Sequence, residues 1–148
     1  MKLLMPIFFL LNIYPMSACE CGLLNIRENY KNADVVFYGR VIQVMDKTMD
    51  GYDDAYLITR DGAYLNDGGF FPSIQIIKKY RGKRKFFKTG KIQIHQDWSL
   101  CDFFFKTGRY YLVFGFLDKN GILKTDVCTA TKEFKVDNFE AQIGVYLN

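Results

Sequence analysis

Residues 34–44 are the most strongly apolar stretch of the chain outside its first residues, and they predict a central strand. Arg40 and Gln43 are the only charged or amide side chains that follow Asp34 there. β-Branched and aromatic residues at this density favour a strand. Gly39, in the middle of the stretch, predicts a bulge or a sharp bend of the kind that lets a small sheet curl into a barrel.

Shorter patterns predict further strands downstream. Residues 91–95 alternate polar and apolar side chains, which is the period of a strand. Asn120 and Gly121 form a hairpin turn signal, because this pair readily supplies the positive φ angles that such turns require. We expect the five main strands at residues 34–44, 70–80, 91–95, 109–116 and 123–127, with a further short strand at residues 103–105.

The hydrophobic pattern also predicts a short helix at each end of the domain. Apolar residues within residues 23–33 recur at spacings close to one helical face. Near the end of the chain Phe139, Ile143 and Leu147 lie four residues apart, as on a helix that covers an end of the sheet. Together these elements predict a mainly β fold, a five-stranded Greek-key barrel of the oligonucleotide/oligosaccharide-binding (OB) type. A β-sandwich stays open, because periodicity does not reveal strand order.

The first 18 residues have the pattern of a secretory leader. Lys2 provides the positive end, a mostly apolar run follows, and Ala18 is a small residue at the expected cleavage point. The apolar run is too short to indicate a membrane span. We expect residues 1–18 to be removed as a signal peptide. Residues 19–148 would then form one exported domain, secreted or periplasmic, in which disulfides persist.

A second interpretation of the same junction stays open. Met16, Ser17, Ala18 and Cys19 together are similar to a bacterial lipobox, after which Cys19 would be acylated and would anchor the protein to a membrane. Acylation would leave three of the four cysteines for pairing. An odd thiol is disfavoured in an exported protein, which argues for the soluble form.

Composition and charge limit the class of protein. A chain of 148 residues, 49% of them hydrophobic, is long enough for one domain with a real core. The formal net charge of +4 falls to +3 when Lys2 leaves with the leader. This bias is too small to indicate a nucleic-acid partner.

Residues 46–69 are predicted to form a long loop between two strands. Loops of this length in compact domains are usually functional or mobile. Its aspartates lack the alternating spacing and the final glutamate of a calcium-binding loop, so we expect a solvated acidic loop.

No catalytic constellation can be assembled from the sequence. His95 is the only histidine, without a partner that would make it a metal ligand, and we expect it to be an ordinary strand residue. Asp97 and Asp102 flank Trp98, but their spacing within a loop indicates no particular chemistry. We therefore expect no enzyme activity and no cofactor.

Residues 78–85 carry a basic run with aromatic neighbours at Tyr80, Phe86 and Phe87. Barrels of the OB type often bind glycans or nucleic acids, so this run leaves such binding open as an alternative function. The simpler interpretation is a solvated hairpin.

Several motifs occur in order along the chain: Cys19-Glu20-Cys21, Asn32-Ala33-Asp34-Val35-Val36, Ile77-Lys78-Lys79-Tyr80-Arg81-Gly82, Leu100-Cys101-Asp102, residues 108–115, and Thr125-Asp126-Val127-Cys128. Taken together, they resemble the netrin-like domains and most closely the inhibitory domain of the tissue inhibitors of metalloproteinases. The resemblance covers nearly all of residues 19–148. The chain departs from the inhibitors at Lys31, where they have a cysteine.

The resemblance implies a disulfide pattern and a partner. Of the three pairings that four cysteines allow, it implies Cys19 with Cys101 and Cys21 with Cys128. It also implies that the free amine and the carbonyl of Cys19 chelate the zinc of a partner metalloprotease, that Glu20 enters the specificity pocket, and that a ridge lies alongside. The ridge would consist of Ser99, Leu100, Cys101 and Asp102.

Overall fold

The computed structural model describes residues 19, 21–22, 25–44, 68–97, 99, 101–135 and 139–147. The predicted leader, residues 1–18, lies outside them, as does the predicted acidic loop up to residue 67. In chain order the elements are α1 (Ile26–Asn32), β1 (Val35–Val44), β2 (Pro72–Arg81), the 3-10 helix η2 (Arg84–Phe87), β3 (Lys91–Gln93), β4 (Tyr110–Leu117), β5 (Leu123–Lys124), β6 (Lys132–Phe134) and α4 (Phe139–Leu147).

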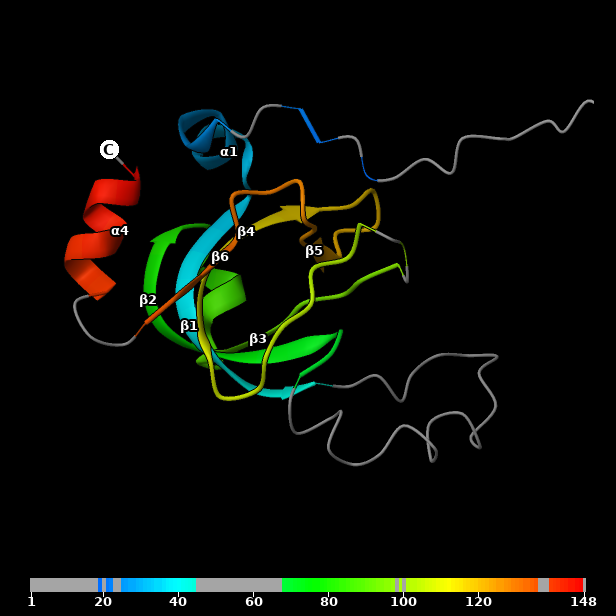
Figure 1. Cartoon of the computed structure of the whole chain (residues 1–148). Coiled ribbons are helices and arrows are strands. Elements are labelled where there is room, and N and C mark those ends of the chain that lie inside the picture. Colours follow the sequence, from blue (N-terminus) through cyan, green and yellow to red (C-terminus); the bar gives the residue numbers. More distant parts are fainter. Residues whose placement is uncertain are drawn as a thin grey trace, which may run out of the picture.

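The strands form one curled antiparallel sheet around β1 (Figure 1). Its order is β3-β2-β1-β4-β5, and β6 pairs with β4 on the side opposite β1. The two ends of this order meet at a parallel bridge between His95 and Lys124, where the His95 amide donates to the Leu123 carbonyl at 2.9 Å. The mainly β, OB-like class predicted from the sequence is therefore confirmed, as a small and partly open barrel.

β1 is apolar along most of its length because both of its faces are covered. Val35, Phe37 and Val41 belong to the cluster that fills the barrel, whereas Val36 and Tyr38 belong to a second cluster on the outside. The helices α1 and α4 and the strand β6 contribute side chains to this outer cluster. Burying one such side chain stabilises a fold by roughly 1.5 to 3 kcal/mol, so the burial of β1 on both faces contributes strongly to stability.

Gly39 is the point at which β1 bends over β2. A Cβ atom at this position would lie 2.5 Å from the carbonyl oxygen of Gln75 and 2.7 Å from a side-chain carbon of Ile74. The pairing of β1 with β2 shifts register between Tyr38 and Gly39. The bend predicted here is confirmed, and it requires glycine because the two backbones approach too closely for any side chain.

The two helices pack on the outside of the barrel. α1 begins at Ile26, where the Asn25 side chain caps it by accepting from the amide of Arg27 at 3.0 Å. Leu23 and Leu24, included in the predicted helix, lie outside the described residues. α4 buries Ile143 to 1% exposure, and its Tyr146 hydroxyl donates to the Ala130 carbonyl at 3.0 Å. Figure 1 shows α4 lying outside the curled sheet.

The structure corrects the predicted strands in three places. A sixth strand, β6, follows the predicted five and was missed because only three residues pair. The predicted strand at residues 123–127 is reduced to β5 and one isolated bridge at Asp126. At residues 103–105 there is no strand, because only Phe105 forms a bridge, with Gly69.

Candidate functional site

Two disulfides hold the start of the described chain against the barrel. Cys19 is joined to Cys101 and Cys21 to Cys128, across 82 and 107 residues of sequence. These are the pairs that the family resemblance implies. Two such bonds are typical of a protein that folds in an oxidising, non-cytosolic compartment.

The loops that receive these bonds lie side by side. Asp102 and Asp126 form an isolated antiparallel bridge, and the Val127 amide donates to the Cys101 carbonyl at 2.8 Å. Cys19 and Cys21 are thus tied to two adjacent segments rather than to distant ones. The disulfide ridge, as we call it, comprises Cys19, Cys21, Ser99, residues 101–102 and residues 126–128.

Aspartate side chains shape both loops of the disulfide ridge. The Asp102 carboxylate accepts from the Ser99 amide at 2.9 Å, and the Asp126 carboxylate accepts from the Cys128 amide at 2.9 Å. Such side-chain to backbone bonds replace the ladder bonds that a loop lacks. Each loop therefore presents its cysteine from a fixed turn.

The disulfide ridge is the acidic end of the described molecule. Burial, together with the neighbouring charge of Asp102, raises the pKa of Asp126. Lys124 sits between the carboxylates of Asp97 and Asp118, which raises its own pKa. Backbone hydrogen bonds, first from Ile122, and the Lys124 ammonium hold the pKa of Asp118 below its ordinary range.

Cys19 is placed for main-chain rather than sulfur chemistry. Its sulfur is bonded to Cys101, and among the described residues its carbonyl accepts one hydrogen bond, from the Cys21 amide at 3.1 Å. A carbonyl oxygen has two lone pairs, so one remains for a ligand. The Cys19 nitrogen is joined to Ala18 in this chain, and it becomes an amine when that bond is cut.

The structure brings together four of the predicted site residues. Cys19, Cys101, Ser99 and Asp102 all belong to the disulfide ridge, and Ser99 is exposed. Glu20 and Leu100 lie outside the described residues. Asp126 was not predicted as a site residue, although it lies in the motif Thr125-Asp126-Val127-Cys128.

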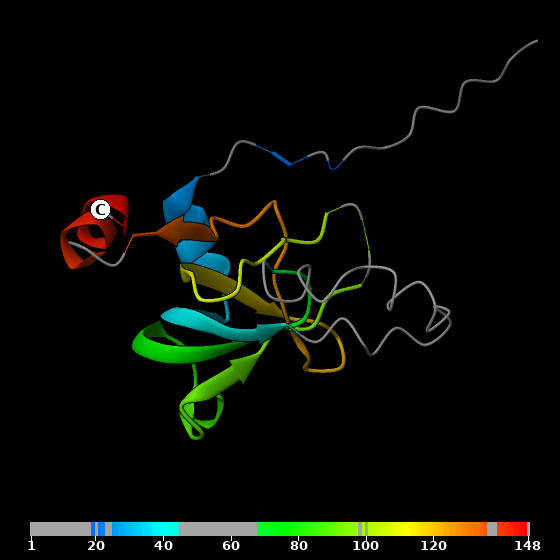
Figure 2. The same cartoon turned by 60° about the horizontal axis from the view of Figure 1, so that its bottom comes forward.

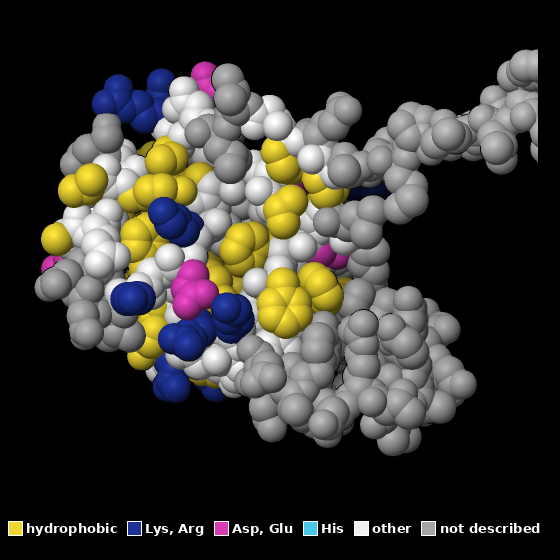
Figure 3. All heavy atoms as spheres, viewed as in Figure 1, with side chains coloured by type: hydrophobic (Ala, Val, Ile, Leu, Met, Phe, Trp, Pro, Cys, Tyr) yellow, Lys and Arg dark blue, Asp and Glu magenta, His cyan; other side chains and the backbone are white. Residues whose placement is uncertain are grey.

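Sequence reasoning also missed an aromatic edge next to the disulfide ridge. The rings of Phe70 and Phe104 meet edge to face at 5.6 Å, and Phe104 is 40% exposed. The buried Gln96 side chain fixes their segments, accepting from the Phe71 amide and donating to the Phe103 carbonyl, each at 2.7 Å. Figure 3 shows hydrophobic side chains gathered across the middle of the face that Figure 1 presents. A buried polar residue that joins two segments through its side chain leaves no periodic pattern in the sequence, so the role of Gln96 could not be predicted from the sequence.

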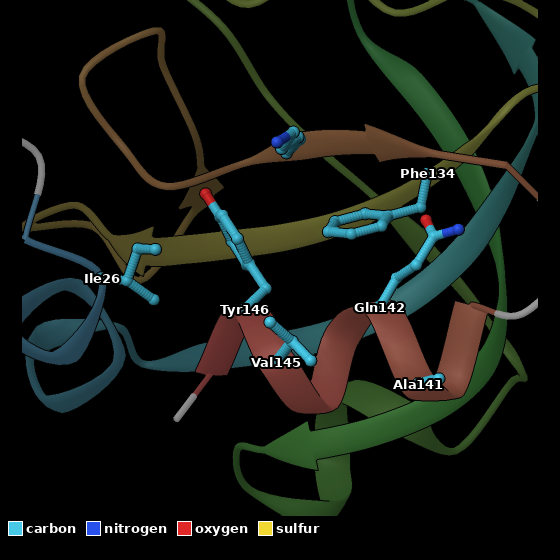
Figure 4. A pocket seen from close by; sticks show the side chains of 7 residues that line it. Ile26, Phe134, Ala141, Gln142, Val145 and Tyr146 are labelled. Carbon is cyan, nitrogen blue, oxygen red and sulfur yellow. The ribbon is translucent and has the colours of Figure 1, made fainter.

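A hollow of about 560 Å³ lies elsewhere, between α1, β6 and α4 (Figure 4). Ile26, Phe134 and Tyr146 form its apolar walls, and Val145 on its rim is 82% exposed. The described residues that line it include one cation, Lys132, and no carboxylate or histidine. This lining can hold apolar groups, but it carries no set of groups for acid, base or nucleophilic chemistry.

His95 lies where the two ends of the sheet meet. Its ring stacks edge to face on Phe71 at 6.3 Å, and its backbone joins β5. In the described part of the chain, no group of three or more His, Cys, Asp or Glu side chains is arranged to hold a metal ion. Within the same residues, no helix has the length and apolar character needed to cross a bilayer.

Comparison with known proteins adds no further assignment: no protein-family model and no curated protein sequence matches this chain.

Proposed function

We propose that this protein is an exported binding module of the netrin-like type, without catalytic activity, whose partner-facing surface is the disulfide ridge. The observation that carries the proposal is the attachment of Cys19 and Cys21 to two adjacent loops. A chain terminus normally frays, and a flexible segment loses conformational entropy when it binds. A terminus fixed by two bonds has already lost that freedom. The partner would be an extracellular or cell-envelope protein.

A sharper form of the proposal is inhibition of a zinc metalloprotease through Cys19. Cleavage after Ala18 would create an amine beside the Cys19 carbonyl, which keeps one lone pair. A neutral amine and a carbonyl oxygen can both coordinate zinc, and a catalytic zinc site keeps an open position. The chelating pair would then be held in place by the bond from Cys19 to Cys101.

The neighbouring side chains would decide which protease fits. Glu20 would extend toward the specificity pocket, and a carboxylate leaves water at a cost of several kcal/mol unless a cation receives it. The aromatic edge at Phe104 adds apolar contact area beside Ser99 and Asp102. The expected target is therefore a metalloprotease with a basic pocket and an apolar rim.

The test compares two proteins that differ by one residue at the N-terminus. One begins at Cys19, and the other carries an additional alanine before Cys19, so that the amine is moved while both disulfides remain. Against a panel of zinc metalloendopeptidases, we expect the first to inhibit at least one, and the second to be weaker by about 100-fold or more, which is roughly 2.7 kcal/mol of binding free energy. Equal potency of the two proteins, or inhibition by neither, would contradict chelation.

Mass spectrometry of the exported protein tests the same step independently. We expect a mature chain that begins at Cys19 with a free amine. An acyl chain on Cys19 would rule out zinc chelation, because an acylated amine is not a ligand, and would leave a lipid-anchored envelope module in its place.

A further inference from the structure

Positive charge is concentrated in a single connection of the barrel. Eight of the chain's 20 Lys and Arg residues lie between residues 78 and 91, and no Asp or Glu occurs between Gly68 and Gln96. We call residues 78–91 the basic arm. It comprises the end of β2, the 3-10 helix η2 and the start of β3.

The basic arm turns Phe86 and Phe87 into the barrel and its cations outward, while Tyr80 packs on the outer cluster beneath Lys78. The Ile76 amide donates to the Gly90 carbonyl at 2.9 Å, so the chain leaves β2 and returns beside it. Within this loop Phe86 and Phe87 pack against the cluster that fills the barrel. The eight Lys and Arg residues are all exposed. Phe86 and Phe87 therefore pack into the barrel, and the charged groups of the arm are exposed to solvent.

Few of these cations are neutralised by the described residues. Lys78 pairs with Glu140 of α4 at 2.8 Å, and the Arg81 guanidinium donates to the Tyr30 carbonyl at 2.9 Å. Asp34 adjoins the arm near Gly82, but its carboxylate accepts from the Leu117 amide at 2.8 Å. Among the described residues, seven of the eight cations of the arm have no carboxylate within ion-pair distance: Lys79, Arg81, Lys83, Arg84, Lys85, Lys88 and Lys91.

The basic arm is also remote from the disulfide ridge. Figure 2 shows the green connection between β2 and β3 at the opposite end of the molecule from the blue N-terminal segment. The carboxylates of Asp97, Asp102, Asp118 and Asp126 lie at or next to the ridge, so the two ends differ in sign. A ligand of the arm would leave the ridge accessible.

From this arrangement we infer that the basic arm binds an anionic polysaccharide. Exposed cations on a protruding loop attract an extended polyanion along its length and hold it by charge. Single-stranded nucleic acid is a poorer match because it requires exposed aromatic rings for its bases, and Phe86 and Phe87 are turned into the barrel. A membrane surface is a poorer match because insertion needs exposed apolar side chains, and none lies between Lys83 and Lys91 in the structure. The disulfides place the protein in a compartment where glycans are the more accessible polyanions.

The test compares two variants with the same net charge. In K83E/R84E/K85E the charge of the arm is reversed, and in K106E/K119E/K135E the same change is made at exposed lysines elsewhere. With heparin as the probe at 0.15 M salt, we expect the arm variant to lose about tenfold or more in affinity, while the control stays close to the original protein, since screened charges act locally. Near-ultraviolet circular dichroism checks that both variants keep the fold.

Every outcome of this comparison bears on the inference. Equal losses in the two triple variants would overturn it, because binding would then depend on net charge alone. Tighter binding of single-stranded DNA, or of vesicles rich in anionic lipid, than of heparin would also overturn it. The inference does not rest on the proposed function, so loss of heparin binding leaves protease inhibition unaffected, and the reverse holds as well.

Discussion

The barrel wall, by which we mean strands β1 to β6, and the disulfide ridge are stabilised by different kinds of interaction. β1 is fixed by burial on both faces and by ladders with β2 and β4, all of them weak contacts that add up along the strand. The ridge has almost no regular secondary structure. It relies on two disulfides and on two turns in which an aspartate carboxylate accepts a hydrogen bond from a backbone amide. The comparison teaches that the fold and the candidate site of this protein can be changed separately.

Removing both disulfides is expected to have the largest effect. In the chain-entropy model, replacing all four cysteines by serine opens the overlapping loops of 107 and 82 residues and lowers the free energy of unfolding by at least about 5 kcal/mol. Urea denaturation measures this loss against the oxidised protein. C21S/C128S alone should lose less, because the bond between Cys19 and Cys101 still constrains the unfolded chain. A loss below about 1 kcal/mol with both bonds removed would show that the ridge does not depend on its covalent bonds.

Truncating the core of β1 should cost almost as much while leaving the ridge intact. Phe37 is completely buried inside the barrel, and Phe37→Ala is expected to lower the free energy of unfolding by about 3 to 5 kcal/mol because it leaves a cavity. The matched control is Val145→Ala at a site that is 82% exposed, where the change should stay within about 0.5 kcal/mol. If the two variants were equally stable, burial of β1 could not be what holds the wall.

The wall could be predicted from sequence because its signals are local. The apolar run of β1, the alternation near Ile92 and the turn at Gly121 each identify an element within a few residues. β6 was missed because three residues are too few for a period, and its pairing with β4 is decided by tertiary contact.

The ridge could not be predicted in the same way. Four cysteines allow three pairings, and only the family resemblance singled out the pattern in which Cys19 joins Cys101. That Asp102 and Asp126 face each other depends on the curl of the sheet, which brings together loops far apart in sequence. Gln96 shows the same limit, because its two bonds join segments on either side of it.

The smallest expected effect is a change in the pH dependence of stability. The pKa of Asp126 is raised above its ordinary value of 3.8, so the folded protein binds this proton more tightly than the unfolded chain. Its stabilising contribution is therefore present at low pH and is lost as the pH rises from 3.8 through the raised value. Asp126→Asn cannot titrate, and its oxygen can still accept from the Cys128 amide. We expect this substitution to remove the decline in stability that accompanies the rise in pH.

The measurement is the difference in free energy of unfolding between the original protein and Asp126→Asn across acidic to neutral pH. Asp118→Asn is a control of opposite sign, because the lowered pKa of Asp118 makes its contribution grow as the pH rises. A difference that does not vary with pH would show that burial of Asp126 has no energetic consequence.

The bridge between Asp102 and Asp126 has a further consequence for how the protein matures. Cys101 and Cys128 become neighbours only after the sheet has curled, and their partners lie 82 and 107 residues away along the chain. Closing loops of that length early is entropically unfavourable, at about (3/2)RT ln n for n residues. We therefore expect oxidation to the native pairs to follow the curling of the sheet, so that thiols which react earlier would form non-native pairs.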